Sequence, residues 1–333
     1  MARSQLRVSI SFLISITFLS FQLCAALLPT QQIYQFPNGT FVENLAVRPD
    51  GSIIVTLATS PEIYLIQPNM NNPNPKLLHR FEGSTSTLGI AEVAPDSFVV
   101  GLSNVSGPGQ TVPGSSQLWS VTFPRRNVDK ARVSLVAKLP DVLAPNGIVP
   151  INKDRVLVAD SAKGLVFVVD LESGKSRVAI TDPLLNTTPQ LPVGVNGLKL
   201  DGNTLHFTTS AQNLLGKVEI NLKTGAALGA AVKIVNGLPP AVGYDDFALR
   251  KNEAFVTSAA GNFVERVDMK TKEQTIIAGR IDSTEIAEPT AAAFGRNGKE
   301  DILFVTTGGG LFFPVNGNEI VGGQLVAVKV GKK

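Results

Sequence analysis

A unit of about fifty residues recurs six times along this chain of 333 residues, and this repeat constrains the fold more than any other feature. Each unit has a polar start, a short apolar strand, a turn, a second strand that ends in small hydroxyl residues, and two further strands. The second strands SIIVTLATS (from Ser52), DRVLVADSA (Asp154) and DILFVTTGG (Asp301) show the similarity. Four strands per unit, with no room for helices, predict an all-β fold: a six-bladed β-propeller with four-stranded antiparallel blades.

The two ends of the repeat array predict how the ring closes. The sixth unit ends after its third strand (from Gly323), and Gln31–Phe36 is a spare strand at the other end of the chain. Pairing the two would leave no blade with an exposed outer edge. We therefore expect an N-terminal strand to complete the sixth blade, within a single propeller domain over residues 27–333.

The first residues have the pattern of a secretory signal peptide. Arg3 and Arg7 precede an apolar, serine-containing run over Val8–Leu23, and Cys24-Ala25-Ala26 supplies small residues for cleavage. We expect residues 1–26 to be removed, although the run approaches membrane-spanning length, which leaves a signal anchor as the alternative. No later segment of the sequence is long enough to span a membrane. The only cysteine lies in this leader, so the mature chain would have no disulfide and no thiolate.

Sequons and charge indicate the compartment and exclude one class of partner. Asn38, Asn104 and Asn186 each begin an Asn-X-Ser/Thr motif, which suits N-glycosylation of a chain in the secretory pathway or outside the cell. The formal net charge is +3, and loss of Arg3 and Arg7 with the leader would lower it to +1. Such a nearly neutral surface gives no electrostatic footprint for nucleic acid.

The polar starts of the six units are candidates for a shared site. Innermost propeller strands surround a central channel, so we expect these starts to gather at one mouth as polar groups in an apolar concavity. An Asn-Gly pair can also simply make a turn, whereas Glu43 and Asp246 would be costly to bury unpaired. The candidate residues are Glu43, Asn44, Glu92, Asn146, Asn196, Asp245, Asp246 and Thr290.

Other conspicuous residues have simpler structural interpretations. His206 has no neighbouring nucleophile pattern and reads as a packed core residue, Trp119 reads as a blade-packing residue, and Asp160 as a turn residue. The glycine run 308–310 lacks the Lys-Ser/Thr and helix of a phosphate loop, so we expect a tight turn at the channel edge. The long polar loops 103–116 and 181–193 could fold over the mouth as lids.

Two segments carry a resemblance to a known superfamily. VGVNGLKLDGNTLHFTTS (from Val193) and EPTAAAFGRNGKEDILFVTTGGG (from Glu288) resemble the senescence-marker-protein/gluconolactonase superfamily of six-bladed propellers. ENLAVRPDG (Glu43), VLVADSAKGLVFVVD (Val156) and YDDFAL (Tyr244) are more similar to a fungal secreted subgroup. That subgroup includes proteins similar to the hetero-Diels–Alderases of tropolone–sesquiterpenoid biosynthesis. The resemblance spans nearly all of the mature chain.

The subgroup resemblance implies a cyclase that couples an ortho-quinone methide to an alkene such as humulene, and we rank this first. Such chemistry needs an apolar cavity that orients two small apolar molecules, polar groups that assist loss of water and stabilise charge, and no cofactor. Glu43, Asp245 and Asp246 would be the catalytic residues. The substrate-binding residues would be Asn44, Glu92, Asn146, Asn196 and Thr290.

The superfamily resemblance implies a second activity, a metal-dependent lactonase. Glu43, Asn196 and either Asp245 or Asp246 match its metal ligands, with Asn146 as a possible fourth, and these oxygen donors would suit Ca²⁺ or Mg²⁺. The chain departs from that pattern because Asn44 replaces a Gly-Pro after Glu43, and Asp-Asp replaces Asp-Gly in the later blade. A ligand-binding propeller without chemistry is the third alternative, since the fold alone decides none of these.

Overall fold

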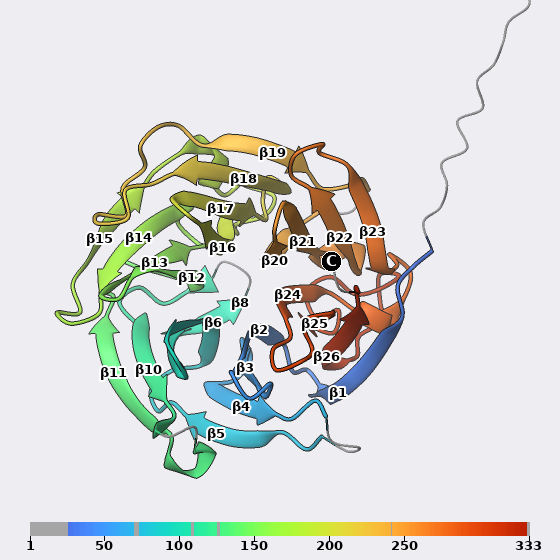
Figure 1. Cartoon of the computed structure of the whole chain (residues 1–333), viewed down its shortest axis with the longest axis horizontal. Coiled ribbons are helices and arrows are strands. Elements are labelled where there is room, and N and C mark those ends of the chain that lie inside the picture. Colours follow the sequence, from blue (N-terminus) through green and yellow to red (C-terminus); the bar gives the residue numbers. More distant parts are fainter. Residues whose placement is uncertain (1–25, 70–72, 108–109, 125–126, 241, 332–333) are drawn as a thin grey trace, which may run out of the picture.

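A computed structural model describes residues 26–69, 73–107, 110–124, 127–240 and 242–331 of the chain. Six four-stranded antiparallel sheets stand around a central axis as blades (Figure 1). The prediction of a six-bladed propeller is therefore confirmed. The predicted signal peptide lies outside the described residues except for Ala26. Within the described part of the chain, no helix has the length and apolar character that crossing a membrane requires.

Blades one to five run from the innermost to the outermost strand in chain order. The first blade consists of β2 (Val42–Val47), β3 (Ile53–Leu57), β4 (Glu62–Ile66) and β5 (Lys76–Arg80). The second consists of β6 (Ser86–Ala94), β7 (Ser97–Ser103), β10 (Gln117–Thr122) and β11 (Arg132–Lys138). The third consists of β12 (Pro145–Asn152), β13 (Arg155–Asp160), β14 (Leu165–Asp170) and β15 (Ser176–Ile180). The fourth blade consists of β16 (Val195–Asp201), β17 (Thr204–Thr209), β18 (Leu214–Glu219) and β19 (Val232–Asn236). The fifth consists of β20 (Tyr244–Arg250), β21 (Glu253–Ser258), β22 (Phe263–Asp268) and β23 (Gln274–Gly279).

The sixth blade joins both ends of the chain. Its three inner strands are β24 (Pro289–Phe294), β25 (Ile302–Thr307) and β26 (Gly322–Lys329), and its outermost strand is β1 (Thr30–Asn38). β1 pairs antiparallel with β26 from Thr30 opposite Val328 to Asn38 opposite Gly322. The predicted closure by an N-terminal strand is therefore confirmed, and β26 has no free edge that another chain could pair with.

Burial falls from the axis to the rim of the disc. All five residues of β3 are buried, because this strand packs between two neighbouring blades, whereas β5 at the rim is mostly exposed or half-buried. One core cluster joins Val55 of the first blade to Phe304 and Leu325 of the sixth. The β-branched and aromatic residues of the inner strands fit these two-sided interfaces between pleated sheets.

The innermost strand of the second blade corrects the sequence interpretation. It begins at Ser86, and Glu92 lies near its far end, opposite Phe98. The sequence predicts Glu92 as the polar start of this unit, but the residues near the first residue of the strand are Leu88 and Gly89. A Cβ at Gly89 would overlap the backbone of Asn146 in the third blade, so the close approach of the two strands requires glycine here.

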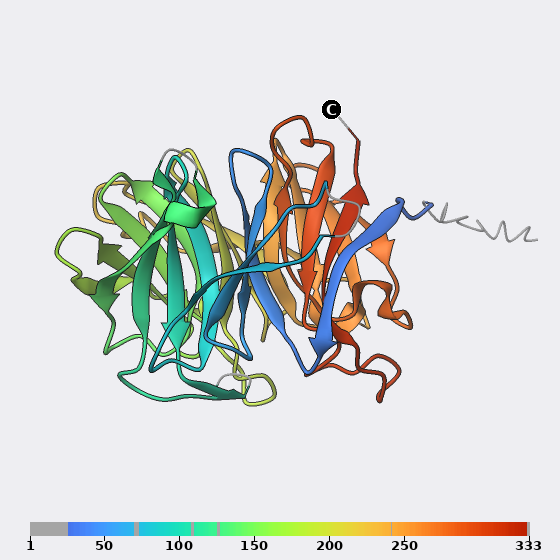
Figure 2. The ribbon, with the colours of Figure 1, turned by 90° about the horizontal axis from the view of Figure 1, so that it is seen from below.

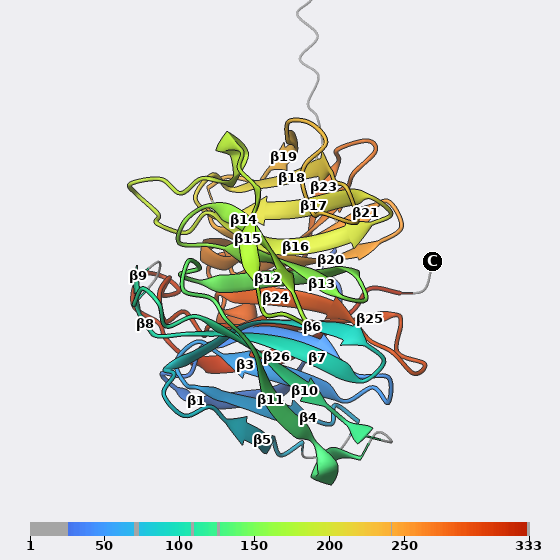
Figure 3. The same ribbon diagram turned by 90° about the vertical axis from the view of Figure 1, so that its left-hand side faces the viewer.

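Three loops cover one face of the disc. The hairpin β8 (Val105–Gly107) and β9 (Gln110–Thr111) and the loop between β25 and β26 extend from the same face (Figure 2), and Figure 3 shows β8 and β9 at one side, away from the C-terminal end. The loop 181–193 contains the short 3-10 turn η3 (Pro183–Leu185) and contributes residues to the pocket under this face. Further 3-10 turns are η2 (Val128–Lys130), η4 (Ala259–Gly261) and η5 (Thr284–Ile286).

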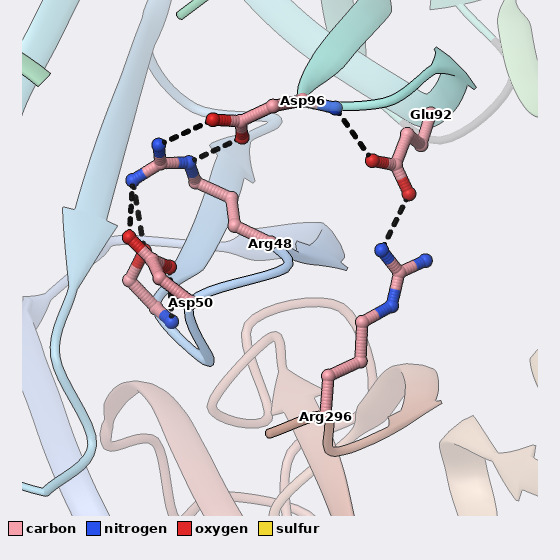
Figure 4. A network of polar contacts seen from close by, with 6 residues as sticks. Arg48, Asp50, Glu92, Asp96 and Arg296 are labelled. Atoms are coloured by element: carbon pink, nitrogen blue, oxygen red, sulfur yellow. Dashed lines mark hydrogen bonds and ion pairs between the residues drawn. The ribbon is translucent and has the colours of Figure 1, made fainter. Parts of the chain in front are cut away.

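Ion pairs connect blades at the opposite face (Figure 4). Arg48, after β2, is fully buried, and its guanidinium donates two hydrogen bonds of 2.8 Å to Asp96 in the second blade. Asp50 lies 3.0 Å from the same guanidinium. Arg296 of the sixth blade lies 2.5 Å from Glu92 of the second. The Arg48 pair locks two blades together, because removing one partner would leave a buried charge uncompensated.

Candidate functional site

Every innermost strand has a β-bulge at the same place near its start. The register shifts, for example, between Val42 and Asn44 in β2 and between Val195 and Leu198 in β16. A bulge adds one residue to the strand and redirects its side chain. The residues at the six bulges are Glu43, Leu88, Asn146, Asn196, Asp245 and Thr290. Five of these are predicted polar starts.

A cavity of about 130 Å³ lies on the axis under the three loops. The bulge residues of blades one to five line it, so sequence positions far apart do converge. Most of the remaining lining is apolar and comes from residues that flank the inner strands and from all three loops. These apolar lining residues include Phe41, Ala58, Val105, Ala144, Leu191, Val193, Phe312 and Phe313. The described lining contains no Lys, Arg or His.

Glu43 is a buried carboxyl group in this pocket, with 7% of its surface exposed. Its Oε1 accepts a hydrogen bond of 2.8 Å from the Asn146 amide. Burial raises the pKa of Glu43 to about 7, the Asn146 amide lowers it, and the charge of Asp246 raises it further. Glu43 therefore titrates near neutral pH, where it can give or take a proton.

Asp245 is the second carboxyl group of the pocket. Burial holds its pKa well above the usual range, and the charges of Glu43, Asp246 and Glu288 act in the same direction. A hydrogen bond from the Asn196 side chain opposes this shift. Carboxyl groups that disfavour each other's ionisation retain protons at neutral pH. Asp245 is thus placed to act as an acid beside Glu43.

Two amide oxygens in the pocket are free acceptors. Among the described residues, neither Asn146 Oδ1 nor Asn196 Oδ1 has a hydrogen-bond partner, although both are buried. The Asn196 amide donates to Ser210 Oγ at 3.1 Å, and that hydroxyl donates to the Tyr244 carbonyl at 2.7 Å, which fixes the orientation of Asn196. An unpaired buried carbonyl is costly unless a ligand or water contacts it.

The same oxygens test the metal site that the superfamily resemblance implies. Two carboxyl groups and two free amide oxygens are donors that suit a hard divalent cation. The Asn146 and Asn196 oxygens fit this role by their lack of other partners. The described residues nevertheless contain no group of three or more His, Cys, Asp or Glu that could hold a metal ion. Any cation here would depend on the two amides.

Asn44 and Asp246 close the channel below the pocket. Asn44 Nδ2 donates to Asp246 Oδ2 at 3.2 Å across the axis, between blades one and five. Asp246 Oδ1 accepts from Lys199 Nζ at 2.5 Å and from the Phe247 amide at 2.8 Å. The Asp pair is therefore divided: Asp245 lines the pocket, whereas Asp246 and Asn44 line the cavity on the opposite face.

Two further predicted residues lie outside the pocket lining. Glu92 lines the cavity on the opposite face, where it pairs with Arg296. Thr290 is buried at the bulge of β24, and its hydroxyl donates to the Val42 carbonyl at 2.7 Å, so it connects the sixth blade to the first. Of the eight candidates, the pocket lining contains Glu43, Asn146, Asn196 and Asp245. The catalytic and binding roles of these residues stay predictions.

Glu288 is a pocket residue that the sequence interpretation missed. It lies one residue before β24, has 1% of its surface exposed, and burial raises its pKa to about 8. The predicted polar start of this unit, Thr290, does lie at the bulge of β24, and Glu288 precedes it by two residues. An acidic residue directly before an apolar strand was the signal that could have found Glu288. Ser161 and Ser210, at the ends of second strands, also line the pocket.

The simpler structural interpretations hold for the remaining conspicuous residues. His206 is buried in β17, and burial lowers its pKa. Trp119 packs against Phe81 with ring centroids 5.5 Å apart. Asp160 accepts hydrogen bonds from the amides of Leu143, Ala144 and Lys163, as a turn residue does. Gly309 and Gly310 have positive φ, as the predicted tight turn requires.

The sequons lie at different depths in the fold. Asn38 is exposed at the end of β1, and Asn186 is exposed directly after η3. Asn104 is half-buried between β7 and β8, and its Oδ1 is shielded from solvent. Exposure of Asn38 and Asn186 is compatible with glycosylation, which stays a prediction for all three sites.

Fold and site together define a six-bladed β-propeller with an acidic, largely apolar pocket on its axis. No family model matches the chain. It is similar to a protein of Sarocladium schorii provisionally named a hetero-Diels-Alderase, with 27% identity over 84% of this chain and 78% of that protein. A protein of a Phoma species with the same provisional name is 26% identical over 86% of this chain and 88% of that protein. The resemblance stated from the sequence is confirmed at this level.

Solved structures confirm the fold of the chain. A luciferin-regenerating enzyme superposes with a TM-score of 0.67 at 12% identity, over 91% of this chain and 95% of that one. A calcium-binding protein, regucalcin, from Agrobacterium tumefaciens superposes with a TM-score of 0.61 at 15% identity, over 92% of this chain and 96% of that one. At these identities the likeness concerns the propeller architecture alone.

Proposed function

We propose that this chain is a cyclase of the hetero-Diels–Alderase type, which joins an ortho-quinone-methide-like diene to an alkene such as a humulene derivative. The names of its relatives support this class of reaction. The observation that carries the proposal is the pair of carboxyl groups, buried Glu43 and half-buried Asp245, in a pocket whose lining is mostly apolar. The chemistry needs acid–base assistance and a dry cavity, and it needs no nucleophile.

The carboxyl pair suits the formation of the diene. The precursor is a phenol with a hydroxymethyl group beside its hydroxyl, and the reaction removes one water. Asp245, held protonated, donates its proton to the departing hydroxyl as the carbon–oxygen bond breaks. Glu43 in its ionised form takes the phenolic proton, and the Asn146 amide orients it for this. The two carboxyl groups then exchange one proton to return to their starting state.

The apolar walls suit the cycloaddition itself. One carbon–carbon and one carbon–oxygen bond form, with no proton transferred, so the protein contributes orientation and exclusion of water. The free oxygens of Asn146 and Asn196 are acceptors for a ring hydroxyl of the diene, which would fix the face that reacts. The cavity of about 130 Å³ is smaller than a typical ligand pocket of roughly 300–1,000 Å³, so both partners fit only when the covering loops open.

The proposal is tested with purified protein, an ortho-hydroxymethyl phenol and humulene, with product stereochemistry measured by chiral chromatography. We expect one stereoisomer in excess and a rate above that of the uncatalysed mixture. Glu43→Gln and Asp245→Asn should each lower kcat by about a hundredfold, as loss of a general acid or base does. Glu172→Gln is the matched control, because Glu172 is exposed in the turn between β14 and β15. A racemic product formed at the background rate would exclude the cyclase.

A metal-dependent lactonase is the second candidate, and the free oxygens of Asn146 and Asn196 favour it. Together with Glu43 and Asp245 they would hold a divalent cation, which when bound would polarise a lactone carbonyl. Hydrolysis of an aldonolactone that is lost with EDTA and restored by Ca²⁺ would support this activity. Cycloaddition that continues unchanged in EDTA would support the cyclase.

A further inference from the structure

The loop after β25 enters the pocket beside Glu288. Phe312 and Phe313 of this loop line the cavity, and Phe312 packs against Phe41 of the first blade with ring centroids 5.0 Å apart. Phe312 is 38% exposed, so part of this residue is accessible. The Phe41–Phe312 pair therefore forms an aromatic wall of the pocket, which blades one and six build together.

Backbone contacts hold Glu288 in an unusual conformation. It has φ of +55°, a conformation that costs energy for a residue other than glycine. Its amide donates to Asn262 Oδ1 at 2.9 Å, and its carbonyl accepts from the Gly308 amide at 2.7 Å. Strain of this kind persists only where surrounding contacts over-determine the position, and it is concentrated at functional sites.

The Glu288 side chain contacts the loop that bears the aromatic wall. Its Oε2 accepts a hydrogen bond of 3.1 Å from the Phe312 amide, and the neighbouring amides of Leu311 and Phe313 lower the pKa of the carboxyl group. A Cβ at Gly308 would lie 2.3 Å from the Phe41 ring and 2.8 Å from Oε2, so this glycine leaves room for both the ring and the acid.

We propose that Glu288 is a positioning residue that holds Phe312 against Phe41, and that the wall so formed selects a planar, uncharged ring as the partner bound beside Glu43 and Asp245. This inference rests on the proposed function and assigns the diene precursor to the aromatic wall. A planar ring can pack against the accessible part of Phe312. An anionic ring would lie among three carboxyl groups without a described basic residue in the lining to pair with it.

The test measures binding of 2-naphthol, a planar uncharged probe, by calorimetry at neutral pH. We expect 2-naphthol to bind, and naphthalene-2-sulfonate and the non-planar 2-decalol to bind about tenfold more weakly or worse. Phe312→Leu should weaken 2-naphthol binding by about five- to tenfold, because it keeps the apolar bulk and removes the ring. Equal binding of the three probes would overturn the selectivity of the wall.

A double-mutant cycle then tests whether Glu288 acts through Phe312. Glu288→Ala removes the acceptor of the Phe312 amide, and it should weaken 2-naphthol binding by about fivefold in the parent chain. In the Phe312→Leu background the same change should have less than about a twofold effect. Additive effects would show that Glu288 does not act through the ring. Glu288→Gln keeps one acceptor oxygen, as the protonated acid does, so it should retain binding within about twofold, and a loss as large as that of Glu288→Ala would contradict the contact with the Phe312 amide. Circular dichroism checks that both variants fold.

The two proposals fail separately. If the probe preference and the coupling hold but no precursor is cyclised, the cyclase proposal fails, whereas the wall and its positioning residue remain. If cycloaddition proceeds and the cycle is additive, the role of Glu288 fails and the cyclase remains.

Discussion

At the scale of residues, burial decides the protonation of the pocket. Burial is the largest cause of the raised pKa of Glu43, Asp245 and Glu288, and their mutual repulsion adds to it. No cation in the described lining offsets these shifts. The raised pKa values of the site therefore follow from the positions of three carboxyl groups in the fold. The residues that neighbour each acid in the sequence could not have predicted these shifts.

Glu43 makes stability depend on pH. Its pKa of about 7 in the folded protein exceeds the ordinary glutamate value of about 4.5, so it contributes stability below about pH 4.5 that is lost as the pH rises through about 7. Glu43→Gln should remove this loss, which for one group shifted this far is on the order of 3 kcal/mol at pH 8. The measurement is urea unfolding at pH 5 and pH 8, with Glu172→Gln as the control. An equal stability difference at both pH values would contradict the raised pKa.

At the scale of elements, the repeated bulge makes the site. Asn146-Gly147 and Asn196-Gly197 were recognised in the sequence as pairs that could be turns or pocket residues. Both pairs lie at bulges, where the Asn lines the cavity and the Gly lets the next blade approach. The sequence identified these positions because local composition marks a bulge. The sequence pattern misplaced the start of β6 because the residue at its bulge, Leu88, is apolar.

Gly147 should not tolerate a side chain. A Cβ there would overlap the carbonyl oxygen of Asn196, which is backbone and cannot move aside. We expect Gly147→Ala to lower the free energy of unfolding by about 1–3 kcal/mol or more, as overpacking does. The matched control is Gly229→Ala, since a Cβ at Gly229 meets nothing within 4 Å. Chemical denaturation measures both variants, and equal stability of the two would contradict the close approach of the blades.

At the scale of the whole molecule, ring closure holds the pocket together. β1 supplies the outer strand of the blade that ends the chain, and Thr290 connects that blade to the first through the Val42 carbonyl. Glu43 in blade one and Glu288 beside blade six are neighbours only in the closed ring. Closure thus positions two of the three pocket acids.

A chain that begins at Gly39 should therefore lose its site as well as its outer strand. Without β1 the edge of β26 is exposed, and we expect a lower unfolding midpoint, self-association and weaker 2-naphthol binding. Analytical ultracentrifugation and calorimetry measure these effects against the chain that begins at Ala26. Adding the peptide TQQIYQFPN (Thr30–Asn38) should restore binding in part. Unchanged association state and binding would show that closure is dispensable.

The sequence by itself determined the six blades, their strands, the closing strand and four of the residues that meet in the pocket, because strand periodicity and turn composition are local properties that repeat. Only the tertiary structure decided that Asp245 enters the pocket while Asp246 closes the channel. Adjacent residues of a strand point to opposite faces, and the bulge in β20 determines which of the two aspartates points to the pocket. The tertiary structure alone also brought Glu288 to the amides of the 311–313 loop. That contact joins segments more than twenty residues apart through a backbone turn that no local pattern encodes.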